Sequence, residues 1–112
     1  MAIPQNGCLL RIFIGESDKH DGKPLYEWIV LQAREHGLAG ATVTRGIEGF
    51  GRASRIHTAK ILRLSEDLPI VVEIVDAPEK IDAFIDIVDP VIDGGLVTIE
   101  NVQVRLYRSK NK

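Results

Sequence analysis

The chain has 112 residues, of which 45% are hydrophobic and 27% are charged, and its formal net charge at pH 7 is −2. These values are typical of an ordinary soluble globular protein, so we expect one domain over residues 1–112. The slightly negative balance provides no overall basic field that would attract nucleic acid.

The sequence also bears on the compartment. Cys8 is the single cysteine, so an intrachain disulfide is excluded. No apolar run is long enough to cross a bilayer, and the first residues, MAIPQNG, lack the basic and apolar regions of a signal peptide. We therefore expect a cytoplasmic protein.

The first elements predicted are a strand and a helix. Residues 8–14 (CLLRIFI) are largely apolar on both alternating faces, which indicates a strand that is covered on both sides. Asp21 or Lys23 would cap a helix that has Pro24 at its first position. Gly37 would end this helix in a left-handed cap.

A short second strand is expected at residues 41–45, followed by a long loop at residues 46–67 that is rich in glycine and poor in large apolar residues. Residues 59–64 alternate enough to form an extended segment or a short hairpin within it. Residues 68–75 (LPIVVEIV) give the strongest strand pattern of the chain. Because compact domains rarely contain some twenty irregular residues without a purpose, the loop is the first candidate for function.

The last elements predicted are a second helix and a fourth strand. Pro78 would open the helix, and the pair Gly94 and Gly95 would form a tight connection into a strand at residues 96–107. The apolar phase of that strand shifts at residues 100–101, so we expect a β-bulge there.

The order strand–helix–strand–strand–helix–strand predicts an α+β fold, the ferredoxin-like split βαβ sandwich (βαββαβ), with the long loop between strands 2 and 3. Both helices would cover one face of an antiparallel sheet. The other face would then expose Leu9, Phe13, Val71 and Val75. Since a patch of this kind is unfavourable in water, we expect a closed homo-oligomer.

The loop and the glycine pair carry the candidate binding residues. Glycine lets main-chain amides approach an anion closely, and arginine offers a planar fork for phosphate. The alternative without ligand binding is that the glycines form turns that need positive φ angles and that the arginines are solvated surface charges. The candidate ligand-binding residues are Gly49, Gly51, Arg52, Arg55, Gly94 and Gly95.

The stretch GLAGATVTRGIEGFGR, residues 37–52, resembles the nitrogen-regulatory PII signal-transduction proteins. The chain is more similar still to an uncharacterised PII-like branch of unassigned function, through GKPLYE at residues 22–27 and SRIHTAKILRLSEDLPIVVEIVD at residues 54–76. The resemblance covers residues 8–107.

This resemblance implies a non-enzymatic regulator that forms a homotrimer and binds a small anionic effector, such as an adenine nucleotide, at subunit clefts. It places phosphates near Gly49, Gly51 and Arg52, and near the Gly94–Gly95 turn. The loop would act on a target protein, for example a membrane transporter. Ala53 stands where PII proteins have a glutamine that helps to hold 2-oxoglutarate, which argues against sensing of that molecule.

Two other classes share the expected fold. A small ferredoxin-like enzyme of the acylphosphatase kind needs an arginine-bearing loop after its first strand, and GESDKHDGK, residues 15–23, has none. A trimeric divalent-cation-tolerance protein needs metal ligands, and three histidines and one cysteine are not spaced as ligands. We therefore expect no catalytic residues, no metal and no cofactor.

Overall fold

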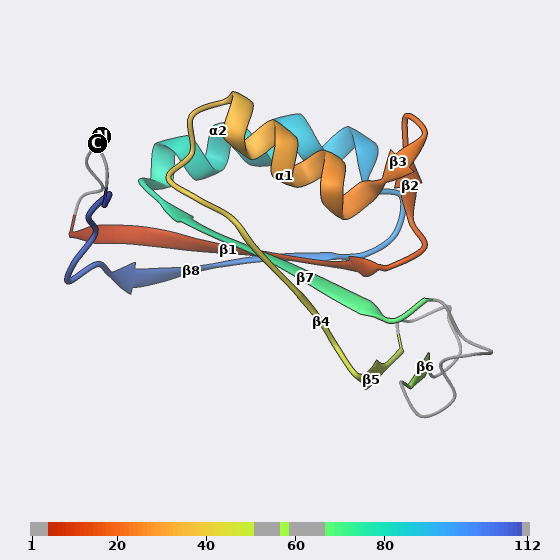
Figure 1. Ribbon diagram of the computed structural model, residues 1–112. Helices are drawn as coiled ribbons and strands as arrows, with labels where there is room; N and C mark the ends of the chain where they lie inside the picture. Colours follow the sequence, from red (N-terminus) through yellow and green to blue (C-terminus); the bar gives the residue numbers. More distant parts are fainter. Residues whose placement is uncertain (1–4, 51–56, 59–66, 111–112) are drawn as a thin grey trace.

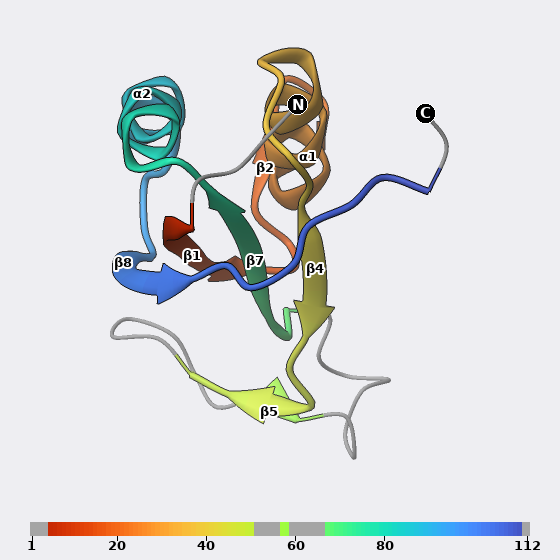
Figure 2. The ribbon, with the colours of Figure 1, turned by 90° about the vertical axis from the view of Figure 1, so that its left-hand side faces the viewer.

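The computed structural model describes residues 5–50, 57–58 and 67–110. Its centre is a four-stranded antiparallel sheet in the order β4-β7-β1-β8 (Figure 1). Figure 2 shows both helices side by side on one face of this sheet, which leaves the other face open. The expected α+β ferredoxin-like arrangement is confirmed.

The sheet is built around β1 (Asn6–Gly15), which pairs with β7 (Pro69–Asp76) on one side and β8 (Leu96–Gln103) on the other. The short β4 (Thr42–Arg45) pairs with β7 at the far edge. Alternate side chains of β1 face the helices and are buried, as the two-residue period requires. They are Cys8, Leu10, Ile12 and Ile14.

Two helices complete the core. The buried stripe of α1 (Leu25–Glu35) is Leu25, Ile29 and Ala33, and that of α2 (Pro78–Val88) is Ile81, Phe84 and Val88. These positions recur at three- and four-residue spacing, so one side of each helix meets the sheet. Each large apolar side chain buried in this way stabilises the fold by about 1.5–3 kcal/mol. A 3₁₀ helix, η2 (Asp89–Val91), follows α2.

The end of α1 follows the sequence prediction. Gly37 has φ 76°, its amide donates to the Arg34 carbonyl at 3.2 Å, and the Leu38 amide donates to the Ala33 carbonyl at 3.0 Å. This pair of bonds is the Schellman motif, in which a left-handed glycine satisfies the last helical carbonyls.

The beginning of α1 differs from the prediction. Asp21 and Gly22, with φ 58° and 81°, form the turn of a small hairpin between β2 (Lys19–His20) and β3 (Lys23–Pro24). Asp-Gly favours tight hairpin turns because both residues tolerate positive φ. Neither Asp21 nor Lys23 caps the helix, which starts at Leu25 after Pro24.

The predicted bulge in the last strand is wrong. The β1–β8 ladder runs without interruption from Asn6 opposite Gln103 to Phe13 opposite Leu96. Because β8 is an edge strand and largely exposed, a change in the phase of its apolar residues leaves no buried face to restore. The strand also ends at Gln103 instead of continuing to residue 107.

Asp76 is the buried charged residue among those described, with 1% of its surface exposed. One carboxylate oxygen accepts a hydrogen bond from the Ala39 amide at 2.9 Å, and the other accepts one from the Ala77 amide at 2.7 Å. The side chain therefore joins the segment before β4 to the start of α2. No sequence pattern indicated this role, because the two amides that Asp76 binds are brought to it by the tertiary fold and by the start of α2.

Candidate functional site

The loop at residues 46–67, called the arm below, leaves the sheet between β4 and β7 (Figure 1). Its base is not irregular: β5 (Glu48–Gly49) and β6 (His57–Thr58) pair antiparallel, with Gly49 opposite His57. Residues 51–56 and 59–66 lie outside the described part of the chain. The candidate residues Gly51, Arg52 and Arg55, and the extended segment or short hairpin expected at residues 59–64, belong to them.

The glycines at the root of the arm pack closely against Pro69. A Cβ at Gly46 would lie 2.9 Å from the Pro69 Cγ, and one at Gly49 would lie 3.0 Å from the same atom. Neither glycine has a positive φ, so the explanation by turn conformation does not apply to Gly49. Glycine suits both positions because the backbone passes close to a proline ring, and a side chain there would press against it.

Both ends of the arm are held by the turn that follows β1. On the entering side, Arg45 Nε lies 3.4 Å from Glu16 Oε2. On the leaving side, Asp67 Oδ1 accepts a hydrogen bond from the Ser17 amide at 2.9 Å, and the Glu16 amide donates to the Leu68 carbonyl at 2.8 Å. The turn therefore fixes where the arm starts and where it ends.

The second predicted binding element, the Gly94–Gly95 turn, lies at the same end of the sheet. A Cβ at Gly95 would lie 2.5 Å from the Phe13 carbonyl oxygen, so no side chain fits there, whereas a Cβ at Gly94 would meet nothing within 4 Å. Gly95 is thus fixed against β1, and Gly94 has free space around it.

Of the described candidate residues, Gly49 and the Gly94–Gly95 turn are not brought together within one chain. Gly49 packs on Pro69 beside β4, while Gly95 packs on Phe13 beside β8, and β4 and β8 are opposite edges of the sheet. Three inter-strand steps of about 4.8 Å separate these edges, which is about 14 Å.

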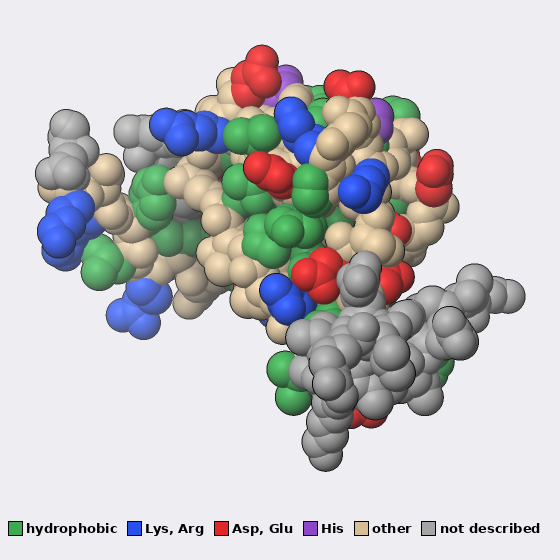
Figure 3. Space-filling model, turned by 45° about the vertical axis from the view of Figure 1, so that its right-hand side comes forward, with side chains coloured by type: hydrophobic (Ala, Val, Ile, Leu, Met, Phe, Trp, Pro, Cys, Tyr) green, Lys and Arg blue, Asp and Glu red, His purple; other side chains and the backbone are tan. Residues whose placement is uncertain are grey.

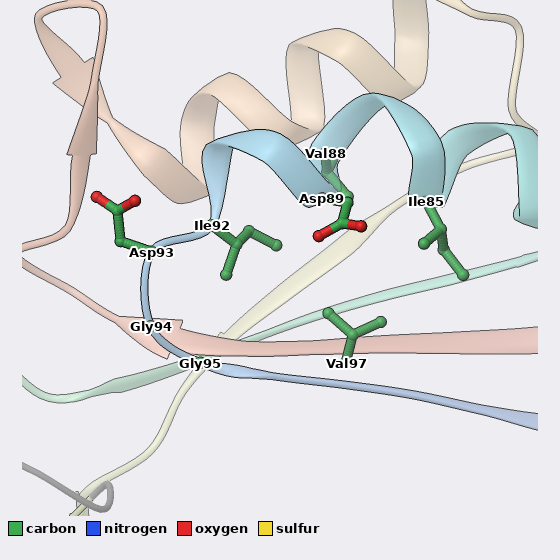
Figure 4. A pocket seen from close by; sticks show the side chains of 8 residues that line it. All are labelled: Ile85, Val88, Asp89, Ile92, Asp93, Gly94, Gly95 and Val97. Atoms are coloured by element: carbon green, nitrogen blue, oxygen red, sulfur yellow. The ribbon is translucent and has the colours of Figure 1, made fainter.

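A groove of about 400 Å³ lies between α2 and β8, next to the glycine turn (Figure 4). We call it the α2–β8 groove. In Figure 4 the side chains of Ile85, Ile92 and Val97 point toward the same space. The Asp89 carboxylate lies above this space, whereas Asp93 lies at its rim and points outward. No cationic side chain lines the groove, so its own charges do not attract phosphate.

The face of the sheet away from the helices, called the open face below, is apolar with one charged cluster. Leu9, Phe13, Val71 and Val75 all lie on it and are partly exposed, as the sequence predicted. Arg11 lies among them, with Nε 2.8 Å from Glu73 and Nη1 3.2 Å from Glu100. The hydrogen bond to Glu73, and then the Glu100 charge, raise the pKa of Arg11. The cluster was missed because it joins three strands far apart in sequence.

Two large apolar side chains are exposed at the root of the arm, Ile47 at 76% and Phe50 at 69%. Among the described residues no group of three or more histidine, cysteine and acidic side chains could hold a metal ion. None of the helices within the described ranges has the length and apolar character to cross a membrane.

Comparison with known proteins agrees with this fold. A UPF0166 protein of Aquifex aeolicus is 44% identical over 96 residues, which cover 86% of this chain and 90% of that protein. A UPF0166 protein of Methanocaldococcus jannaschii is 35% identical over 97 residues, covering 86% and 89%.

Solved structures with the same fold include CPII, a nitrogen regulatory PII-like protein from Thiomonas intermedia K12, bound to ADP, AMP and bicarbonate. It superposes with a TM-score of 0.69 at 18% identity, over 92% of each chain. The apo form of CPII gives a TM-score of 0.61 at 16% identity, over 88% of this chain and 91% of CPII.

Residues 7–104 match the DUF190 family, described as "Uncharacterized ACR, COG1993". With the UPF0166 relatives and the PII-like fold, this match places the protein: the chain belongs to the DUF190 family and has the fold of the PII-like proteins.

Proposed function

We propose that this protein is a non-enzymatic PII-like regulator in the cytoplasm. It binds a small anionic effector, with adenine nucleotides as the first candidates, and acts on a target protein through the arm. One observation carries the proposal: the two glycine-based elements lie at the same end of the sheet but on opposite edges, where neighbouring copies can combine them.

The proposed assembly is a homotrimer that covers the open face. The apolar side chains of that face are unfavourable in water, and Arg11 is already balanced by Glu73 and Glu100, so association buries no unpaired cation there. A cyclic arrangement brings different surfaces of neighbouring copies together, so the β4 edge of one copy approaches the β8 edge of the next.

The proposed ligand contacts are the six residues named from the sequence. Gly94 has unfilled space beside it, which leaves its backbone open to an anion, and Gly49 lies at the base of the arm. Main-chain amides at these glycines and the guanidinium groups of Arg52 and Arg55 would face the phosphates, with Gly51 and Gly95 keeping the backbone accessible. CPII, which shares the fold, was solved with ADP, AMP and bicarbonate, and this supports the choice of effector.

The arm is the part of the protein that we propose contacts the target protein. Because the turn after β1 holds both of its ends, an effector at the arm base would change the conformation between fixed points. Ile47 and Phe50 offer apolar anchors for a target protein, such as a membrane transporter, and large exposed apolar side chains commonly serve this purpose.

Isothermal titration calorimetry of the intact protein with ATP, ADP, AMP and bicarbonate tests the proposal. We expect at least one nucleotide to bind, and Arg52→Ala to weaken that binding about tenfold or more, since a charge-assisted bond to phosphate is lost. Arg34→Ala, on the exposed last turn of α1, is the matched control and should bind normally. Heat from none of these ligands would contradict the nucleotide assignment, and phosphate release from ATP or ADP would contradict the non-enzymatic one.

A further inference from the structure

We propose that Arg45 is a further contact for the anionic group of the effector, and that Glu16 occupies Arg45 until this group displaces it. The proposal rests on the proposed function, because it adds one residue and a mode of regulation to the same site. Arg45 is the last residue of β4, and Glu16 follows β1 in the turn that holds the arm. The ligand class is a small molecule that carries a phosphate group.

Arg45 lies at the base of the arm, next to the glycines already described. It directly precedes Gly46, and Cβ atoms at Gly46 and Gly49 would lie 2.9 and 3.0 Å from the Pro69 Cγ. The backbone at both glycines therefore passes over the same ring. In the ladder Arg45 is opposite Ile70, the residue that follows this proline. An anion that approaches Gly49 thus arrives within reach of the long Arg45 side chain.

The ion pair between Arg45 and Glu16 is loose. Arg45 Nε lies 3.4 Å from Glu16 Oε2, whereas charge-assisted hydrogen bonds of this kind measure about 2.7–2.9 Å. The Arg45 side chain is 53% exposed, and Glu16 is its one ion-pair partner among the described residues. Exposed pairs contribute little to stability, so a competing anion can replace the carboxylate.

Arg11 shows how the protein holds an arginine whose charge is fully used. Its Nε lies 2.8 Å from Glu73 and its Nη1 lies 3.2 Å from Glu100, so two carboxylates share one guanidinium group. The Nη1 and Nη2 groups of Arg45 have no partner within the described part of the chain. Arg45 therefore keeps donors available for a ligand, and Arg11 does not.

A phosphate group has the charge needed to displace Glu16. It carries about −1.5 to −2 at pH 7, more than a carboxylate, and its three acceptor oxygens match the fork of a guanidinium group. Phosphate and the Glu16 carboxylate together would set nearly three negative charges against the one positive charge of Arg45, so the two anions exclude each other. A ligand with a single negative charge gains little from the exchange.

The exchange leaves the ends of the arm in place. The Gly46 amide stays bonded to the Pro69 carbonyl at 2.7 Å, and the leaving end keeps its bonds to the turn after β1. Figure 3 shows basic and acidic side chains together on the described surface at the root of the arm, where the exchange would take place. Only the partner of Arg45 changes, and Glu16 is released within the turn that anchors the arm.

Isothermal titration calorimetry of the intact protein with ADP and inorganic pyrophosphate tests the exchange. Glu16→Gln removes the competing charge and should tighten the binding of both ligands about threefold, a change of the size that an exposed ion pair permits. Tighter binding cannot result from misfolding. Arg45→Gln should weaken binding about tenfold, since a charge-assisted bond to phosphate is lost. Arg45→Lys should bind with intermediate affinity, because it keeps the charge but not the fork.

The double variant Glu16→Gln with Arg45→Gln separates an exchange from simple repulsion. Without Arg45 the carboxylate has nothing to block, so Glu16→Gln should no longer tighten binding. Asp21→Asn is the matched control, because it removes an exposed carboxylate from the tip of the β2–β3 hairpin and should leave both affinities unchanged. Tightening that persists without Arg45, or that Asp21→Asn reproduces, would overturn the exchange. Equal or weaker binding by the single Glu16→Gln variant would overturn it as well.

The result is separable from that of the proposed function. If the protein binds ADP and Arg52→Ala weakens this binding, but the variants at Glu16 and Arg45 bind as the unaltered protein does, the exchange alone is wrong. If neither the unaltered protein nor Glu16→Gln binds ADP or pyrophosphate, the exchange and the nucleotide assignment are both wrong. Binding that appears only in Glu16→Gln supports the exchange, since the carboxylate then blocks the site.

Discussion

Gly46 lies directly against Pro69, with its amide donating a 2.7 Å hydrogen bond to the proline carbonyl and its Cα facing the proline ring. The contact joins the first residue of the arm to the first residue of β7, so the backbone leaves the sheet at one defined place. A proline ring cannot rotate away as a long side chain can. Position 46 therefore tolerates glycine but hardly any residue with a larger side chain.

We expect Gly46→Ala to lower the free energy of unfolding by about 1–3 kcal/mol, the usual cost of forcing an extra methyl group into a packed site. Gly40→Ala is the matched control: a Cβ there meets nothing within 4 Å and the backbone φ is not positive. Chemical denaturation at one fixed protein concentration measures both. Equal stability of the two variants would show that Pro69 does not constrain the arm.

Asp76→Ala should be among the most destabilising single changes that preserve the apolar core. The substitution leaves the partly buried amides of Ala39 and Ala77 without their acceptor, and we expect a loss of about 2–4 kcal/mol in the free energy of unfolding. Asp86→Ala, an exposed carboxylate on α2, should change it by less than about 0.5 kcal/mol. Similar melting curves for the two variants would contradict the anchoring role.

We expect the free energy of unfolding to fall at alkaline pH because of Cys8. Burial raises the pKa of its thiol above the ordinary value of 9.0, and the nearby Asp82 carboxylate raises it further. The unfolded thiol ionises first, so this contribution is complete below pH 9.0 and declines as the pH rises toward the folded pKa. Cys8→Ala should unfold with a weaker dependence on alkaline pH, measured by denaturant titrations from neutral pH upward. An identical dependence in both proteins would contradict the shift.

Val71→Glu should break the proposed assembly. The side chain lies on the open face opposite Phe13, and a carboxylate there would be buried without a partner when copies associate. Sedimentation velocity should show single chains for this variant and oligomers for Leu31→Glu, which alters an exposed position on the helical side instead. An intact oligomer of the Val71→Glu variant would show that the copies use another surface.

The central elements could be predicted from sequence because their patterns are strong. β1 and β7 are apolar on both faces, and the stripes of α1 and α2 recur at helical spacing, so burial and local preference agree. The elements at the edges of the fold were harder to predict from the sequence. The Asp21–Gly22 hairpin turn was overlooked beside a competing helix-cap signal, and the bulge in β8 was inferred from a need for burial that an edge strand does not have.

The candidate site was only partly accessible from sequence. Glycines marked both of its elements, but the reason for Gly49 is the Pro69 ring, a contact across 20 positions that no local pattern reveals. Likewise, the separation of Gly49 from Gly95 follows from strand order and not from the motifs themselves. The α2–β8 groove depends on the tertiary packing of a helix end on a strand, so only the structure brings Asp89 over Val97.

The bond between the Val104 amide and the Gln5 carbonyl has a practical use. It lies at the Asn6 end of β1, whereas the arm is tied to the Gly15 end, and nine residue steps of about 3.4 Å, or about 30 Å, separate them. A fluorescent dye on residue 5 and a second dye on the arm would thus sit roughly that far apart, and a dye pair with a Förster distance of similar size would respond steeply to changes in the separation. Effector-driven rearrangement could then be followed in real time, with the labelled end remote from the binding chemistry.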